Sequence, residues 1–173
     1  MGPVEPEEFS RRVASRVGEA ADSVELNFDK VLVKAAPARM PEILLTLKSD
    51  PETDCKYFTF LSGVDWQADG FEVIVCVYSM THRNTVVVKA RMPKDNPVMP
   101  TLTGVYGGAN WHERECHEMF GISFDGHPNL TNLYLSDDFA GHPLRKDFRL
   151  ASRTYKAWPG AKDPDEAAGG GRG

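Results

Sequence analysis

Three runs of β-type residues in the middle of the chain predict neighbouring strands. The runs cover residues 57–65, 71–79 and 84–91, and only short polar segments separate them. Such short connections favour antiparallel pairing. The second run is apolar at nearly every position, which is typical of a central strand covered on both faces, whereas the third ends in alternation through Lys89 and Arg91. The pattern predicts a small, mostly antiparallel or mixed sheet with helices packed on it.

Two helices and one further strand are predicted before these runs. Apolar residues recur at four-residue spacing over 9–17, which predicts a short amphipathic helix on a loosely attached N-terminal arm. Residues 27–36 predict a strand that ends before Pro37. Pro41 suits the first turn of a second helix, whose apolar spacing continues to the break at 49–51.

A third helix is predicted after the strands, and irregular chain follows it. Thr101 and Thr103 are both suited to cap this helix, which then runs to Phe120. From Gly121 onward Gly, Pro and Asp are frequent, and the only clear periodicity lies at residues 133–135. We therefore predict an α+β fold in three parts: an N-terminal arm over 1–23, a core domain over 24–125 and a long irregular C-terminal segment over 126–173.

Composition narrows the class of protein. The 173 residues suffice for one domain with tails, and 41% hydrophobic and 26% charged residues are typical of globular proteins. The formal net charge of -5, without a block of Lys or Arg, argues against a nucleic-acid partner. The most apolar stretches fall far short of the roughly 20 residues of a membrane span, so we expect any membrane association to be indirect.

The N-terminus and the cysteines indicate a reducing compartment. Residues 1–8 are acidic and Pro-rich, unlike a secretory signal or a transit peptide, so cytoplasmic residence is expected. Cys55, Cys76 and Cys116 are an odd number and show no CxxC spacing. This argues against a disulfide framework and against a sulfur-ligated cluster.

The most information lies between Asn110 and Gly121, where ionisable side chains are dense. On a helix Arg114 and Glu118 are four residues apart and are able to pair. If exposed, such a pair contributes only about 0.3 to 0.5 kcal/mol. If buried at an interface, it fixes orientation and tolerates no truncation, because a charge would be left alone.

The tripeptide Gly-His-Pro occurs twice downstream, around His127 and His142. Glycine before and proline after each histidine restrict the backbone and aim the ring. Such rigidity suits either a ligand site or a docked loop. For both rings we weigh a hydrogen bond to the chain's own backbone equally with direct contact to a partner.

These motifs, taken in order, resemble the signature of the C subunit of respiratory complex I, the NADH:quinone oxidoreductase. The resemblance rests on Trp-His-Glu-Arg-Glu at 111–115, Phe-Gly at 120–121 and Gly-His-Pro at 126–128, followed by Gly-His-Pro-Leu-Arg-Lys-Asp at 141–147. It extends weakly upstream through Gly-Val-Asp at 63–65, and so covers roughly residues 25–150. An ordered set of this length is unlike chance recurrence.

The resemblance implies a non-catalytic structural subunit of the peripheral arm, on the cytoplasmic side of the plasma membrane. Such a subunit carries no flavin, iron–sulfur cluster, metal or quinone site, whereas the complex as a whole carries FMN, iron–sulfur clusters and quinone. Its partners are the homologues of the D, B and I subunits, over which the C-terminal segment wraps. Its enzymatic role is then membership of a proton-translocating oxidoreductase, without catalytic residues of its own.

The resemblance also implies a partner interface made by signature residues. We expect Arg145 to hold a carboxylate of a neighbouring subunit, and Trp111 and Phe120 to serve as core anchors. The expected interface and signature residues are Trp111, Glu113, Arg114, Glu115, Glu118, Phe120, Gly121, His127, Pro128, His142, Pro143, Arg145, Lys146 and Asp147.

The sequence departs from the family pattern at two places, and two alternative functions are considered. His117-Glu118 stands where an aromatic and Asp are more usual, and Thr131-Asn132 stands where arginines often follow. One alternative is the equivalent subunit of a related complex supplied with electrons by deazaflavin, ferredoxin or hydrogen. The other is an independent zinc enzyme, since His112 and Cys116 lie four residues apart, although no third ligand is evident.

Overall fold

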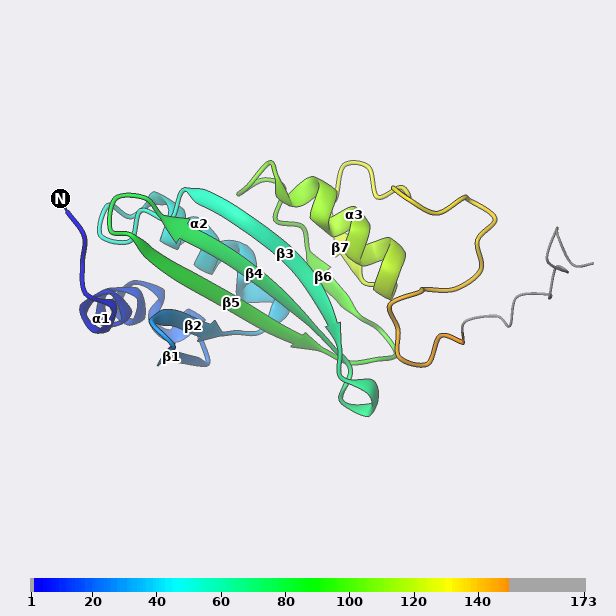
Figure 1. The fold of residues 1–173 in the computed structure, drawn as a ribbon, viewed down its shortest axis with the longest axis horizontal. Coiled ribbons are helices and arrows are strands. Elements are labelled where there is room, and N and C mark those ends of the chain that lie inside the picture. Colours follow the sequence, from blue (N-terminus) through cyan, green and yellow to red (C-terminus); the bar gives the residue numbers. More distant parts are fainter. Residues whose placement is uncertain (1, 150–173) are drawn as a thin grey trace, which may run out of the picture.

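The computed structural model describes residues 2–149, and its main element is a five-stranded sheet (Figure 1). The strand order is β1-β2-β5-β4-β3, and all neighbours are antiparallel except β2 and β5, which are parallel. The predicted mixed sheet and α+β class are confirmed. The strands are β1 (Ser23–Asn27), β2 (Lys30–Lys34), β3 (Tyr57–Asp65), β4 (Phe71–Ser79) and β5 (Asn84–Met92).

Three α-helices and a second, two-stranded sheet complete the fold. The helices are α1 (Pro6–Val17), α2 (Met40–Ser49) and α3 (Ala109–Phe120), and 3-10 turns lie at Gly18–Ala20, Pro37–Arg39 and Gln67–Asp69. The small sheet pairs β6 (Val98–Pro100) with β7 (Ser123–Asp125) in parallel, which places the chain entering and the chain leaving α3 side by side. Within residues 2–149 no helix is both long and apolar enough to cross a bilayer.

The helix α1 belongs to the core rather than to a loose arm. Phe9 and Val13 are fully buried and Val17 is 5% exposed, so the whole apolar stripe faces the sheet and α2. Burying an aromatic and two branched side chains contributes roughly 1.5 to 3 kcal/mol each. The amphipathic helix is confirmed, and the expectation that it is only loosely attached is wrong.

The predicted strand over 27–36 is half of a hairpin. Phe28 and Asp29 form its two-residue turn, with φ of 46° and 59°, and only Lys30–Lys34 continues as a strand. Two consecutive positive φ angles make a type I′ turn, which normally selects Asn-Gly. The sequence offers neither residue here, so the turn could not be predicted.

The helix α3 begins later than predicted. Three glycines in the turns that precede Ala109 keep this stretch from forming a helix, and Thr101 and Thr103 lie too early in the chain to cap it. The Thr101 hydroxyl instead donates a hydrogen bond of 2.6 Å to the Glu113 carboxylate in the middle of the helix.

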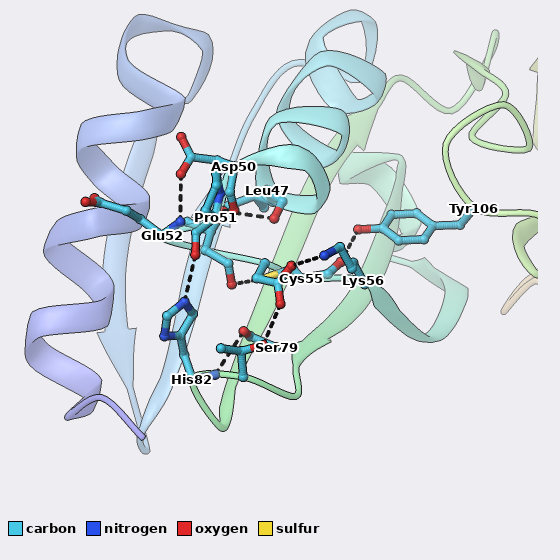
Figure 2. Close-up of polar contacts among 12 residues, drawn as sticks. Leu47, Asp50, Pro51, Glu52, Cys55, Lys56, Ser79, His82 and Tyr106 are labelled. Atoms are coloured by element: carbon cyan, nitrogen blue, oxygen red, sulfur yellow. Dashed lines mark hydrogen bonds and ion pairs between the residues drawn. The ribbon is translucent and has the colours of Figure 1, made fainter. Parts of the chain in front are cut away.

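A buried polar cluster fixes the chain that leads into α3 (Figure 2). His82 is fully buried, and its Nε2 lies 3.0 Å from the carbonyl oxygen of Pro51. The Tyr106 hydroxyl donates to the carbonyl oxygen of Cys55 over 2.6 Å. Most buried polar groups are paired, and these two bonds hold the loop after α2 against both the β4–β5 turn and the approach to α3.

The helices cover one face of the five-stranded sheet. In Figure 1 the strands β3, β4 and β5 lie in front of α2. Val73 and Val75, which share one face of β4, are fully buried. On the opposite face, which no described helix covers, Phe60 is 38% exposed and Ile74 and Val87 are half-buried. The prediction of cover on both faces of β4 is therefore wrong for one face.

Candidate functional site

The signature helix α3 is fixed to the sheet by one face. Cys116 is 2% and Phe120 7% exposed, and the Phe120 ring meets Phe71 edge-on at 6.4 Å. A Cβ at Gly63 would lie 2.7 Å from Cδ2 of Phe120, so the strand β3 requires glycine there. The prediction that Phe120 is a core anchor is confirmed.

Glu113 is a fully buried carboxylate that joins α3 to the preceding segment. It accepts a hydrogen bond from the Thr101 hydroxyl and one from the Leu102 N–H, each over 2.6 Å. Burial raises the pKa of Glu113, and these two donors oppose that rise. The carboxylate thereby binds a backbone N–H group at the start of the turns that precede α3 and holds these turns against the helix.

Glu118 is 3% exposed and holds the C-terminal segment through its backbone. Its carboxylate accepts hydrogen bonds from the N–H groups of Leu133 (2.9 Å), Tyr134 (3.1 Å) and Leu135. Burial alone would raise the pKa of Glu118, but the three N–H donors and the nearby Arg114 together lower it. The group is therefore an ionised anchor that closes the loop around it.

Arg114 binds the same loop from its other side. Its Nε donates to the Thr131 carbonyl oxygen and a terminal nitrogen donates to the Asn132 carbonyl oxygen, both over 2.8 Å. The predicted Arg114–Glu118 ion pair is not among the ion pairs within residues 2–149, since each group binds loop backbone instead. Arg114 binds only the backbone of Thr131 and Asn132. The contact therefore does not depend on the side chains at these two positions, where the family often has arginine.

His127 also contacts backbone of its own chain. Its Nδ1 accepts from the Asn129 N–H over 3.0 Å, so its Nε2 carries the hydrogen and points at the Asn110 carbonyl oxygen, 3.2 Å away. Both ring nitrogens are thus used in fixing the turn at 126–129 against the first turn of α3.

The second Gly-His-Pro motif closes the C-terminal end of α3. A helix leaves its last four carbonyl groups without intrahelical partners. Here the carbonyl oxygen of His117 accepts from the Gly121 N–H, and that of Met119 accepts from the Leu144 N–H. His142 Nδ1 lies 2.8 Å from the Glu118 carbonyl oxygen, and Arg145 Nε donates to that of Phe120 over 2.6 Å.

The segment around Arg145 therefore binds the end of α3 in its own chain. Its guanidinium also lies 5.1 Å from the centre of the Phe71 ring. A cation at this place complements the negative end of the helix dipole as well as the carbonyl group it binds. The proposed contact of Arg145 with a carboxylate of a neighbouring subunit remains a prediction.

The last signature residues attach the segment to the sheet. The Lys146 N–H donates to the Asp65 carboxylate over 2.8 Å, and Asp147 forms a half-exposed ion pair with Lys94 at 3.0 Å. Pro128 and Pro143 follow the two histidines and restrict the backbone at these turns.

Trp111, expected in the core, instead lies on the surface with 62% of its side chain exposed. Together with His112, Glu115, Leu133 and Tyr134 it lines a groove between α3 and the C-terminal segment. The prediction of a core anchor is wrong here because Trp111 faces away from β3, on the side of the helix opposite Phe120 and Cys116.

The two residues of the zinc alternative have other partners. His112 Nδ1 lies 3.0 Å from the carbonyl oxygen of Leu61, and burial raises the pKa of Cys116 to about 12. Among residues 2–149 no three His, Cys, Asp or Glu side chains are grouped so as to hold a metal ion. The structure brings no third ligand from this part of the chain to the pair.

The family described as respiratory-chain NADH dehydrogenase, 30 kDa subunit, matches residues 33–154. The chain belongs to this family. The C subunit of NADH-quinone oxidoreductase from Salinispora arenicola is 38% identical over 136 residues, which are 77% of this chain and 56% of that protein. The same subunit of Roseiflexus sp. strain RS-1 is 40% identical over 69% of this chain and 70% of its own length. The chain thus spans only about half the length of some curated relatives.

Two solved structures share the fold of this 30 kDa subunit family member. A trypsin-resistant fragment (1–134) of Nqo5 superposes with a TM-score of 0.60 at 24% identity, over 72% of this chain and 99% of the fragment. A chain of the membrane-bound sulfane sulfur reductase, an archaeal respiratory membrane complex, superposes with a TM-score of 0.73 at 22% identity. The superposition covers 92% of this chain and 96% of that chain. At these identities the likeness is one of fold.

Three residues of the site in this 30 kDa subunit family member were not predicted from the sequence. Asp65 binds the C-terminal segment through the Lys146 N–H, Thr101 binds the Glu113 carboxylate of α3, and Tyr134 lines the groove. Asp65 ends the Gly-Val-Asp motif and Tyr134 lies in the short periodic stretch at 133–135, so both carried a weak signal. Thr101 gave a wrong signal because it resembles a helix cap.

Proposed function

We propose that this chain is the non-catalytic C subunit of the peripheral, cytoplasmic arm of a proton-translocating NADH:quinone oxidoreductase in the plasma membrane. It braces the homologues of the D, B and I subunits, and so supports electron transfer from NADH to quinone. FMN, the iron–sulfur clusters and quinone belong to those other parts of the complex. Membership of the 30 kDa subunit family over residues 33–154 is the observation that carries this proposal.

Two surfaces support a role in bracing. The C-terminal segment is bonded to α3 through its backbone, which leaves the aromatic side chains of Trp111 and Tyr134 facing outward, 62% and 68% exposed. The sheet face that no helix of residues 2–149 covers presents Phe60 and other partly exposed apolar side chains. Exposed apolar surface of this kind is typical of a protein that binds partners.

The proposal is tested by purifying the tagged chain from gently solubilised host membranes. We expect the homologues of the D, B and I subunits to co-purify, as identified by mass spectrometry, and the preparation to reduce quinone with NADH. A chain that purifies without those homologues contradicts the proposal.

A second candidate is the equivalent subunit of a related complex with another electron donor, such as deazaflavin, ferredoxin or hydrogen. Its basis is the shared fold with a chain of the sulfane sulfur reductase over 92% of this chain. The same preparation distinguishes the two, because an assembly that contains the D, B and I homologues but does not react with NADH favours this candidate.

The tip of the β1–β2 hairpin provides a separate test of binding. Phe28 is 93% exposed and has a left-handed backbone conformation, which costs about 1–2 kcal/mol for a residue other than glycine. We expect Phe28→Gly to raise the free energy of unfolding of the chain by about 0.5–1 kcal/mol, after the extra entropy of glycine, and to lower the yield of co-purified subunits. Denaturant melts and the purification above measure the two effects.

Asp29→Gly is the matched control, because it places glycine in the same turn and keeps the aromatic ring. Asp29 has φ of 59°, a conformation that aspartate adopts readily, so its replacement should not stabilise the chain and should leave the yield of complex unchanged. Equal yields from both variants would contradict a role of Phe28 in binding.

A further inference from the structure

The groove between α3 and the C-terminal segment is lined by two aromatic residues, Trp111 and Tyr134, together with His112, Glu115 and Leu133. Trp111 and Glu115 are four residues apart on α3 and so project from the same side of the helix. Tyr134 and Leu133 form the opposite wall from the C-terminal segment. Aromatic faces attract cations through their quadrupole, and a carboxylate in the same groove adds full charge.

The charges around the groove leave one carboxylate without a partner in the described part of the chain. Glu118 is bound by three N–H groups, and Arg114 is bound by two carbonyl groups of the same loop. Arg114 offsets the charge of Glu118. Among residues 2–149 Glu115 forms neither an ion pair nor a hydrogen bond, so its carboxylate is the acidic group of the groove that is open to a basic partner.

The Trp111 ring and the backbone at Tyr134 have partners within the chain before any ligand arrives. The Arg114 guanidinium lies 5.1 Å from the centre of the Trp111 ring, which restricts that ring from one side. The Tyr134 backbone is held by Glu118 at 3.1 Å. A site whose walls are already ordered loses less conformational entropy on binding than a flexible surface does.

We propose that this groove receives a basic side chain of a neighbouring subunit, which lies between Trp111 and Tyr134 and pairs with Glu115. Arginine fits best, because its planar guanidinium stacks on aromatic rings and offers two parallel N–H donors to a carboxylate. The inference rests on the proposed function, since it names the chemistry of the partner at the surface that the signature helix presents. Aromatic residues and arginine are also the residues that contribute most to binding at protein interfaces.

Site-specific photo-crosslinking in the intact complex tests the inference. A benzophenone amino acid replaces Tyr134, whose ring is largely exposed, and the tagged complex is irradiated after purification. We expect mass spectrometry to find a cross-link to another subunit within two or three residues of an arginine or lysine. Glu115→Lys in the same background should reduce this cross-link roughly tenfold or more, because it places two cations together.

Glu19→Lys is the control for the change of charge, since Glu19 is exposed in the turn after α1, and it should leave the cross-link unchanged. An intact complex overturns the inference if the cross-link is absent, lies within the chain itself, joins a peptide without a basic residue or survives Glu115→Lys. If the unaltered chain purifies without its neighbours, the proposed function fails and the inference fails with it.

Discussion

Replacing Gly121 by alanine is expected to release the C-terminal segment from α3. Gly121 has φ of 73°, a conformation that costs alanine about 1–2 kcal/mol. A Cβ there would also lie 2.6 Å from Nε2 of His142 and within contact distance of the Arg145 guanidinium, so both side chains must move off the carbonyl groups they cap. We expect the free energy of unfolding to fall by about 2–4 kcal/mol.

Hydrogen exchange and thermal melts of the chain measure this effect. The amide of Leu144, which donates to the Met119 carbonyl oxygen, should lose protection in the variant. Gly104→Ala is the matched control, because a Cβ at that position meets no atom within 4 Å. A Gly121 variant that unfolds at the same temperature as the control would show that the capped end of α3 adds little stability.

Local sequence predicted best the strands and helices whose apolar residues follow the pattern of a single type of element. The runs at 57–65, 71–79 and 84–91 fall on β3, β4 and β5, and the spacing after Pro41 falls on α2. Each of these elements buries one continuous face, so burial and local pattern agree. The parallel pairing of β2 with β5 joins segments about 55 residues apart, and no local pattern contains that information.

The signature was interpreted correctly as a set, but the sequence did not reveal what each side chain contacts. Glu118, His142 and Arg145 bind backbone groups that a helix end or a loop leaves without partners. A sequence shows which side chains are charged, whereas the position of an unpaired carbonyl or N–H group follows only from the folded chain. The charges of Glu118 and Arg145 therefore suggested an ion pair and a partner contact, whereas for His142 a bond to the chain's own backbone was one of the two predicted alternatives.

The errors at Trp111 and Thr101 have different causes. A large aromatic at the start of an amphipathic helix is usually buried, but Trp111 lies on the side of α3 that turns away from β3. Threonine is a residue type preferred at helix caps, yet the Thr101 hydroxyl binds the side chain of Glu113. Glu113 lies 12 residues later, in the second turn of the helix. The error at Trp111 arises from the direction of its side chain, which the residue type does not fix, whereas the error at Thr101 arises because the helix begins only at Ala109.

Replacing Glu118 by glutamine is expected to lower the free energy of unfolding at neutral pH by about 1–3 kcal/mol. Glutamine keeps the size of the side chain but offers one acceptor oxygen instead of two, and its amide N–H groups face the N–H groups of the loop at 133–135. Loss of the charge also leaves Arg114 without its nearby anion. Denaturant unfolding of both proteins at pH 7 gives the difference.

The difference between the two proteins should depend on pH in a defined direction. Because the pKa of Glu118 is lowered in the folded chain, its stabilising effect is present above the ordinary value of 4.5 and is lost as the pH falls through the lower folded value. Groups common to both proteins, including Glu113 with its raised pKa, cancel in the comparison. Glu42→Gln, at an exposed ion pair with Arg39, is the control and should cost under about 0.5 kcal/mol. A Glu118 variant as stable as this control at pH 7, or a difference that grows on acidification, would contradict the role of the carboxylate as the ionised anchor of the C-terminal segment.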